Sequence, residues 1–213
     1  MVLRLALKKL IPESLKSFGR NYLSMAKWRQ ANYASPSPHF IKQAVLLRHG
    51  ITNARWVETG THYGYTTKLL ARKFQIVYTI EPSAELYEAS SKTLSRLTNV
   101  VQYLGTSEQH FAAILEKLSG NVCFWLDGHY SGGNTYQART DTPIISELKS
   151  IAAIINKLDN VVILIDDVRC CHTIPAEFPS INHYVNWALE CDLDWTIEHD
   201  IFIAKTKGLN LYP

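Results

Sequence analysis

Four short apolar segments of this chain each end in an acidic residue, and this series constrains the fold more than any other feature. The acids are Glu58, Glu81, Asp127 and the pair Asp166-Asp167. Short continuous apolar runs are typical of parallel strands that are covered on both faces. Open parallel sheets bind ligands beyond the carboxyl ends of their strands, near the point where the strand order reverses. We therefore expect Asp127 and the Asp166-Asp167 pair to converge at a ligand-binding edge.

Strands and helices are expected to alternate along the chain after residue 50. Strands are predicted over residues 55–59, 76–81, 100–104, 121–126 and 161–166. Helices are predicted over residues 64–73, 83–97, 107–118, 143–158 and 180–191. Trp195 to Lys205 predicts a closing antiparallel pair that turns at His199-Asp200. The alternation predicts an α/β fold with a Rossmann-like, doubly wound, mostly parallel sheet, a C-terminal antiparallel strand pair and an N-terminal helical extension.

The N-terminal extension is predicted over residues 1–37 and the main domain over residues 38–213. The linker that separates them contains Pro36 and Pro38. The helical pattern of the extension is interrupted near Pro12 and Gly19. His39 to His49 predicts a helix that ends at Gly50.

The charge of the chain is unevenly distributed. Residues 1–49 hold nine Lys or Arg and one acid, whereas the rest of the chain holds 13 basic and 18 acidic residues. A basic segment of this kind most often caps its domain or builds a homodimer, and more rarely it contacts an anionic membrane surface. Nucleic acid is not expected as a partner, because no recognition motif is present and the basic charge is confined to the N-terminal segment.

The composition is that of an ordinary globular domain, with 46% hydrophobic and 19% charged residues. The four cysteines have neither CxxC nor zinc-ligand spacing, which predicts reduced thiols. No apolar run approaches the roughly 20 residues that span a bilayer. Charge interrupts the N-terminus too early for a secretory signal. These features predict a cytoplasmic protein.

The turn after the first acid is suited to a nucleoside-type cofactor. It contains two glycines four residues apart, Gly60 and Gly64, and a helical pattern follows at once. Glycine lets the backbone pass close to a ligand, and a helix N-terminus offers free N–H groups. Glu81, at the end of the second strand, can accept hydrogen bonds from a vicinal diol. The glycine spacing differs from the Gly-x-Gly-x-x-Gly of pyrophosphate-binding turns.

Residues of about 50 to 206 resemble a class I methyltransferase that uses S-adenosylmethionine. Within that superfamily they resemble the metal-dependent O-methyltransferases, both the catechol type and the type that acts on sugars of macrolide and aminocoumarin antibiotics. The segment from Glu58 to Thr66 matches the catechol-type cofactor loop, and Gly105-Thr106-Ser107-Glu108 resembles the segment that cups the adenine. The resemblance implies that S-adenosylmethionine is held by these residues: Glu58, Gly60, Gly64, Tyr65, Thr66, Glu81, Ser107 and Asp127.

The second group of candidate residues is Asp127, Asp166 and Asp167. Three carboxylates suit a hard cation such as Mg²⁺, and in the resembling families an acid on the fourth strand and a pair on the fifth bind a divalent metal. The alternative is that Asp127 and Asp166 cap helices or pair with arginines. Asp127 is thus predicted to bind the metal, to contact the cofactor and to take part in catalysis.

His129 is predicted to be the general base that removes the proton of the acceptor hydroxyl. The sugar-modifying relatives have Asp-Gly-Asp where this chain has Asp127-Gly128-His129, so a metal ligand or a structural histidine is the alternative. The loop 131–135 is expected either to close over the substrate or to form a surface turn. Four more residues are expected to be either substrate contacts or ordinary surface or salt-bridging residues, namely Arg139, Asp141, Arg169 and His172.

The sequence thus predicts a Mg²⁺-assisted O-methyltransferase that uses S-adenosylmethionine and acts on a hydroxyl of a sugar, glycan or other small diol-containing acceptor. Two alternatives remain at this point. One is a metal-independent methyltransferase, and the other is a non-catalytic binding protein on a degenerate methyltransferase fold.

Overall fold

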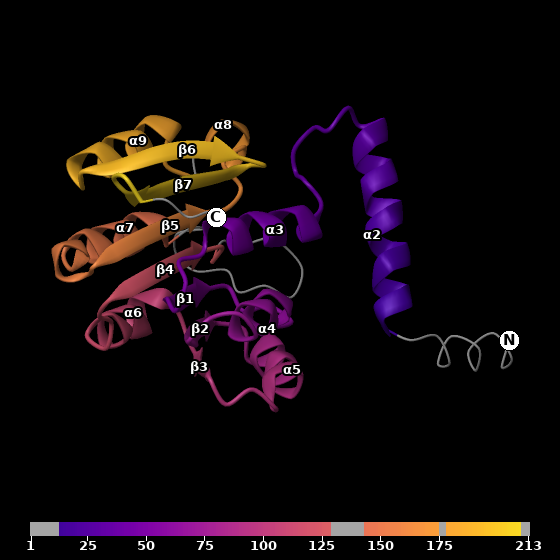
Figure 1. Cartoon of the computed structure of the whole chain (residues 1–213), viewed down its shortest axis with the longest axis horizontal. Helices are drawn as coiled ribbons and strands as arrows, with labels where there is room; N and C mark the ends of the chain where they lie inside the picture. Colours follow the sequence, from indigo (N-terminus) through magenta and orange to yellow (C-terminus); the bar gives the residue numbers. More distant parts are fainter. Residues whose placement is uncertain (1–12, 129–142, 175–177, 210–213) are drawn as a thin grey trace, which may run out of the picture.

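A computed structural model describes residues 13–128, 143–174 and 178–209 of the chain, and it contains a seven-stranded mixed sheet (Figure 1). The strand order is β3-β2-β1-β4-β5-β7-β6. The strands are β1 (Arg55–Thr59), β2 (Ile76–Glu81), β3 (Val100–Leu104), β4 (Asn121–Leu126), β5 (Asn160–Ile165), β6 (Leu193–Glu198) and β7 (Ile201–Thr206). The first five are parallel, and β7 lies antiparallel to both β5 and β6. The predicted fold class is confirmed.

Helices cover both faces of the sheet (Figure 1). Helix α2 (Glu13–Gln30) is the first helix of the described chain. The helices on one face of the sheet are α3 (His39–His49), α4 (Tyr65–Ala71) and α5 (Ala84–Leu94). Those on the second face and near its end are α6 (Ser107–Leu115), α7 (Ile144–Ala152), the short 3₁₀ helix Ile155–Lys157, α8 (Cys170–Thr173) and α9 (Ile181–Glu190). Strand order reverses between β1 and β4, which places the switch point of the sheet in its centre.

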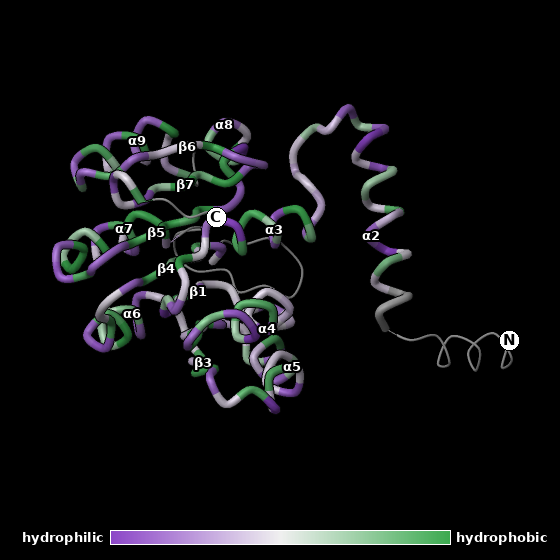
Figure 2. Tube along the Cα trace, in the orientation of Figure 1, coloured by the Kyte–Doolittle hydropathy of each residue, from purple (hydrophilic) through white to green (hydrophobic). Residues whose placement is uncertain are grey.

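Two apolar cores form because alternate side chains of each central strand point to opposite faces. In β1, Val57 packs with the core under α6, α7 and α9, whereas Trp56 packs with the core under α3 and α4. The same division separates Phe124 from Trp125 in β4. Figure 2 shows the apolar residues concentrated along the central strands. Both faces of these strands are buried, which explains their nearly continuous apolar sequence.

The closing hairpin turns where the sequence predicts it. His199 and Asp200 separate β6 from β7, and both have a positive φ, of 50° and 71°. Two consecutive left-handed residues are the geometry of the tight turn that best joins two twisted antiparallel strands.

Three details of the predicted helices are wrong. Helix α2 runs unbroken through Gly19, because one glycine inside a helix costs only about 1 kcal/mol. The helix predicted over 143–158 ends at Ala152 and is followed by a separate 3₁₀ turn. The short helix α8 was not predicted, since four residues are too few for a helical pattern.

Helix α2 stands apart from the sheet and its covering helices (Figure 1). Its carboxyl-terminal end meets the rest of the protein through Trp28, whose ring lies 5.7 Å from that of His199 between centroids. Among the described residues, no helix has the length and apolar character needed to cross a membrane.

We expect Glu147→Gln to reduce the dependence of stability on pH. Glu147 lies on α7 and is 2% exposed, and burial raises the pKa of its carboxyl from 4.5 to about 7. Between these two values the folded protein holds a proton that the unfolded chain has lost. The stabilisation is therefore complete below the unfolded pKa and is lost as the pH rises through about 7.

Thermal unfolding between about pH 5 and about pH 8 tests this expectation. The melting temperature of Glu147→Gln should fall less over this interval than that of the native protein. Glu88→Gln, at an exposed position of α5, is the matched control and should follow the native curve. Parallel curves for the native protein and Glu147→Gln would contradict the assignment.

Candidate functional site

The loop between β1 and α4 depends on its two glycines. Gly60 has a φ of 88°, and a β-carbon there would lie 2.4 Å from the backbone oxygen of Asp127. Gly64 is the N-cap of α4 with a φ of 74°, and a β-carbon there would lie 3.1 Å from Cγ of Leu94. Both positions therefore require glycine for the fold itself. The same backbone places the loop beside Asp127, at the reversal of strand order.

Glu81 lies at the carboxyl end of β2 and is held by the backbone of the neighbouring loops. The backbone N–H groups of His62 and Ser83 donate to its carboxylate at 2.7 Å and 3.0 Å. Burial raises the pKa of Glu81, and these two hydrogen bonds oppose the shift. The carboxylate is fixed directly beside the glycine loop, where the resemblance places the ribose of the cofactor.

Glu58 is fully buried beneath the same loop. It accepts a hydrogen bond from the hydroxyl of Thr67 on α4 and another, of 2.7 Å, from Thr79 on β2. Burial raises the pKa of Glu58 to about 7. These contacts tie α4 and β2 to β1, so Glu58 supports the loop from below. Direct contact of Glu58 with a cofactor stays a prediction.

The other cofactor residues differ in exposure. Tyr65, at the start of α4, is 64% exposed, and Thr66 is half-buried. Ser107 is buried at the first residue of α6. The cofactor role predicted for these three residues stays a prediction.

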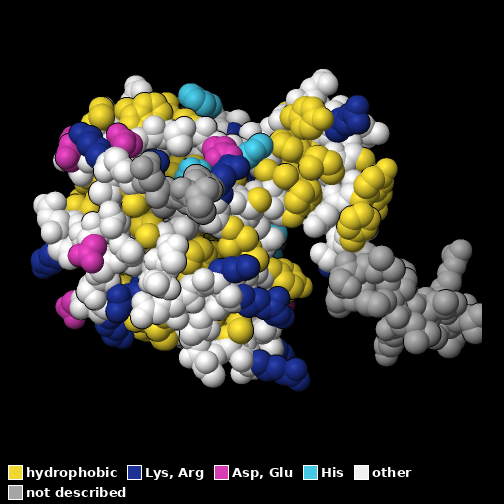
Figure 3. All heavy atoms as spheres, viewed as in Figure 1, with side chains coloured by type: hydrophobic (Ala, Val, Ile, Leu, Met, Phe, Trp, Pro, Cys, Tyr) yellow, Lys and Arg dark blue, Asp and Glu magenta, His cyan; other side chains and the backbone are white. Residues whose placement is uncertain are grey.

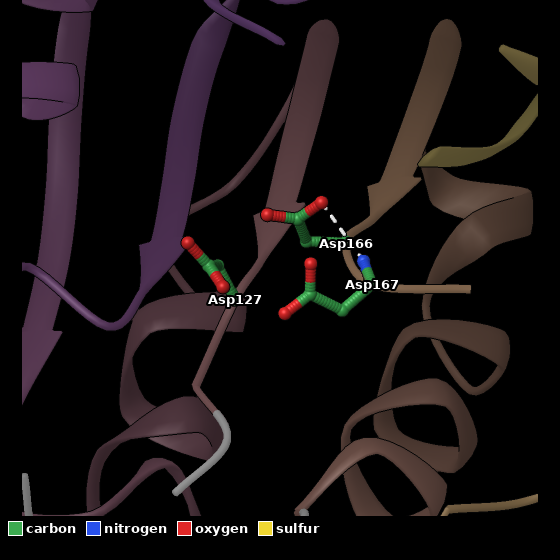
Figure 4. Close-up of side chains that lie close together, drawn as sticks. All are labelled: Asp127, Asp166 and Asp167. Carbon is green, nitrogen blue, oxygen red and sulfur yellow. Dashed lines mark hydrogen bonds between the residues drawn. The ribbon is translucent and has the colours of Figure 1, made fainter. Parts of the chain in front are cut away.

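Asp127, Asp166 and Asp167 gather around one space at the ends of β4 and β5 (Figure 4). One carboxylate oxygen from each residue lies within 4.8 Å of the other two. The backbone N–H of Asp166 donates to Leu126 at 3.1 Å, and that of Asp167 donates to the Asp166 carboxylate at 2.8 Å. Asp167 also has a φ of 59°, which turns the chain so that both carboxylates face Asp127. The structure thus brings the three predicted acids together.

Lys42 contributes an ammonium group to this cluster that the sequence analysis did not assign. Its Nζ donates to the two oxygens of Asp166 at 2.6 Å and 2.7 Å and to Asp167 at 2.8 Å. Burial alone would lower the pKa of Lys42, but Asp166 and Asp167 outweigh it and the pKa is raised. Lys42 is therefore charged, and it links α3 to the end of β5.

The sequence does contain a signal for this position of Lys42. Within the helix predicted over 39–49, Lys42 shares a face with Val45 and Leu46, which are three and four residues further on. Both of these residues are 1% exposed. A lysine on the buried face of a helix needs an acidic partner, and the acid pairs at strand ends supply it.

Arg169 gives the cluster a second positive charge. Its guanidinium contacts both Asp167 and Asp200, and its backbone N–H donates to Asp200 at 2.8 Å. Of the two roles that the sequence left open for Arg169, the structure shows the ion pair. His172 lies on α8, and its contact with a substrate stays a prediction.

The four carboxylates of Asp127, Asp166, Asp167 and Asp200 face two cationic side chains, so the ionised cluster carries a formal charge of −2. Burial, Asp166 and Asp167 raise the pKa of Asp127 well above its ordinary value of 3.8. Burial is also the main reason that the pKa of Asp166 is raised to about 6. A dication would balance the charge, and its all-oxygen donors fit Mg²⁺. Such a cation would share or exchange these carboxylates with Lys42.

Several predicted residues lie outside the described part of the chain. They are His129, the loop 131–135, Arg139 and Asp141. Among the described residues, Asp166 and Glu147 line a small recess together with apolar side chains that include Leu126, Ile144 and Ile165.

Solved structures with the same fold are methyltransferases. NodS, an N-methyltransferase from Bradyrhizobium japonicum WM9, aligns with a TM-score of 0.51 and 13% identity over 78% of this chain and 93% of its own. SMU.1697c from Streptococcus mutans, solved in complex with SAH, aligns with a TM-score of 0.50 and 16% identity over 79% of this chain and 96% of its own. An rRNA methylase from Streptococcus thermophilus aligns with a TM-score of 0.50 and 14% identity over 81% of this chain and 96% of its own.

These alignments show that the chain has the fold of class I methyltransferases. No protein-family model matches the sequence, and no curated protein matches it significantly.

We expect Lys42→Met to destabilise the protein because it leaves Asp166 and Asp167 without their shared ammonium. Removing one partner of a buried ion pair costs about 3 to 5 kcal/mol, and Arg169 keeps the loss near the lower end. Urea unfolding in EDTA measures the change. The matched control is Lys92→Met at an exposed position of α5, which should lose less than about 0.5 kcal/mol. Equal stability of the two variants would show that Lys42 does not balance the carboxylates.

Proposed function

We propose that this protein is an S-adenosylmethionine-dependent O-methyltransferase that acts on a hydroxyl of a sugar or another small diol-containing acceptor. The observation that carries the proposal is the glycine loop between β1 and α4, which contacts the backbone of Asp127 at Gly60 and donates to Glu81 through the N–H of His62. An acid suited to a ribose and a carboxylate cluster suited to a cation would thus lie on either side of one loop, next to the switch point of the sheet. The methyltransferase folds of NodS and SMU.1697c support the choice of reaction class.

Glu81 is the residue that would hold the ribose hydroxyls. Both of its oxygens are fixed by backbone N–H groups, so the carboxylate does not need to be ordered when the ligand binds. Ser107, the first residue of α6, is the residue that would contact the adenine. S-adenosylmethionine, when bound, would supply a methyl group on a sulfonium. The methyl carbon would bond to the acceptor oxygen as its bond to sulfur breaks.

Asp127, Asp166 and Asp167 are the residues that would hold Mg²⁺ and, through it, orient the acceptor. A divalent cation held by these carboxylates would supply Lewis-acid chemistry that lowers the pKa of an acceptor hydroxyl. The ends of β4 and β5 fix these carboxylates in place. The carboxylates would therefore lose little conformational entropy when they position the acceptor relative to the methyl group. The proton of the hydroxyl needs a base, and we assign that role to His129.

The contacts of Lys42 favour a second candidate, a methyltransferase that works without a metal. The ammonium of Lys42 already makes three hydrogen bonds with Asp166 and Asp167. In that candidate the charge of Lys42 takes the place of the cation and the same cofactor loop is used. The two candidates differ in their response to a chelator.

We expect Glu81→Ala to weaken binding of SAH by at least about 10-fold, because each hydrogen bond to a charged group contributes about 1.5 to 3 kcal/mol. Calorimetric titration with SAH, with Mg²⁺ and then with EDTA, measures the affinity. Glu88→Ala, at an exposed position of α5, is the control and should bind as the native protein does. Failure of the native protein to bind SAH under both conditions would overturn the methyltransferase proposal.

We expect Asp127→Asn to lose metal binding and metal-stimulated turnover together. The change removes one of three carboxylates but keeps the side-chain shape, so the affinity for the metal should fall more than the affinity for SAH. Titration with MgCl₂ alone gives the metal affinity, and Asp159→Asn, on an exposed turn, is the matched control. Native turnover that persists in EDTA would replace the Mg²⁺-assisted candidate with the metal-independent one.

A further inference from the structure

Helix α2 presents an apolar face to solvent. Phe18 is 71% exposed, Tyr22 is 69% exposed and Leu23 is 61% exposed. Phe18 and Tyr22 are four residues apart and lie on one side of the helix, and Leu23 widens that side. We call these three side chains the α2 face. Figure 3 shows hydrophobic side chains gathered over α2, at a distance from the main body of the protein. Apolar side chains grouped in this way mark an interaction surface.

The α2 face does not cap the methyltransferase fold. Among the described residues, Trp28 near the carboxyl-terminal end of α2 contacts the chain that follows, and its indole donates to the backbone oxygen of Ala34 at 2.8 Å. The same ring packs edge-on against Tyr33 and tilts against His199. The helix is therefore held at one end, and its exposed side chains lie further along it. The exposure of the α2 face therefore does not fit a segment that caps its domain, and a second copy of the chain or a membrane surface is left as the partner.

The charge of the segment decides between the remaining partners. Residues 1–37 hold seven Lys or Arg and a single acid, Glu13. Two of the basic residues, Lys27 and Arg29, lie in the last turn of α2. A second copy of the helix would bring the same positive charge against it, which opposes pairing. An anionic lipid surface has the complementary charge and also accepts apolar side chains at its interface.

We propose that α2 lies along an anionic membrane surface, with the α2 face inserted among the lipid headgroups and its basic residues near the phosphates. Aromatic and basic residues on one helix are the combination that interfacial helices use. Helix α3, which carries Lys42, follows α2 after a connection of eight residues, 31–38. Surface attachment would thus hold the carboxylate cluster close to the lipid. The proposal does not depend on the reaction that the site performs.

Co-sedimentation of the full chain with vesicles tests the proposal. One set of vesicles is pure phosphatidylcholine and the other contains equal parts of phosphatidylcholine and phosphatidylglycerol. We expect binding at least about 10-fold tighter to the anionic vesicles, with most of it lost in about 1 M NaCl because salt screens the charges. The double variant Phe18→Ser with Leu23→Ser should lose about 10-fold in affinity for the anionic vesicles.

The matched control is the double variant Leu189→Ser with Ile197→Ser, which removes two exposed apolar side chains from α9 and β6. It should bind vesicles as the native protein does. Because all four positions are exposed, circular dichroism should show equal folding of the native protein and both variants. Equal binding to the two kinds of vesicle would overturn the proposal, and so would unchanged binding of the α2 variant. A native dimer in analytical ultracentrifugation that Phe18→Ser with Leu23→Ser dissociates would instead assign the α2 face to a second copy.

Discussion

The ion cluster of Lys42 with Asp166 and Asp167 is the interaction on which the arrangement of the site depends. Two carboxylates at the end of one buried strand repel each other, and burial makes that repulsion costly. The ammonium of Lys42 offsets it and fixes α3 against the sheet. Arg169 then ties Asp167 to the last hairpin through Asp200. The ends of β4 and β5 can therefore hold three acids together only because two other elements supply the counter-charges.

The close approach of two backbones is the second constraint. Gly60 and Asp127 follow neighbouring strands, and no β-carbon fits between them. The glycine that a cofactor loop needs for its ligand is thus also needed for the chain to leave the sheet. Glu58, bonded to Thr67 and Thr79 underneath, fixes the loop from below. The fold alone requires glycine at this turn, and the proposed cofactor would place the same demand on it, so its sequence signal is strong.

The sequence predicted the sheet well because its buried strands have apolar runs that end in acids, and their periodicity differs from that of the helices. The convergence of Asp127 with Asp166 and Asp167 followed from the parallel arrangement of the strands. The role of Lys42 could not be predicted with the same ease, since it depends on which face of α3 meets the sheet, and 124 residues separate it from Asp166. Gly19 misled the helix prediction because local propensity is weaker than the continuity of a helix.

The residues that make up the ion cluster come from elements far apart in the chain. Lys42 belongs to the first helix that packs on the sheet, whereas Asp200 lies in the turn of the last hairpin. During synthesis, an emerging chain that has reached Asp167 already holds its acids but lacks Asp200, which orients Arg169. The site is therefore completed only when the hairpin of β6 and β7 has left the ribosome and β7 has paired with β5. Partly made chains can form much of the sheet, yet a cluster in which Arg169 is held between Asp167 and Asp200 is a property of the finished fold.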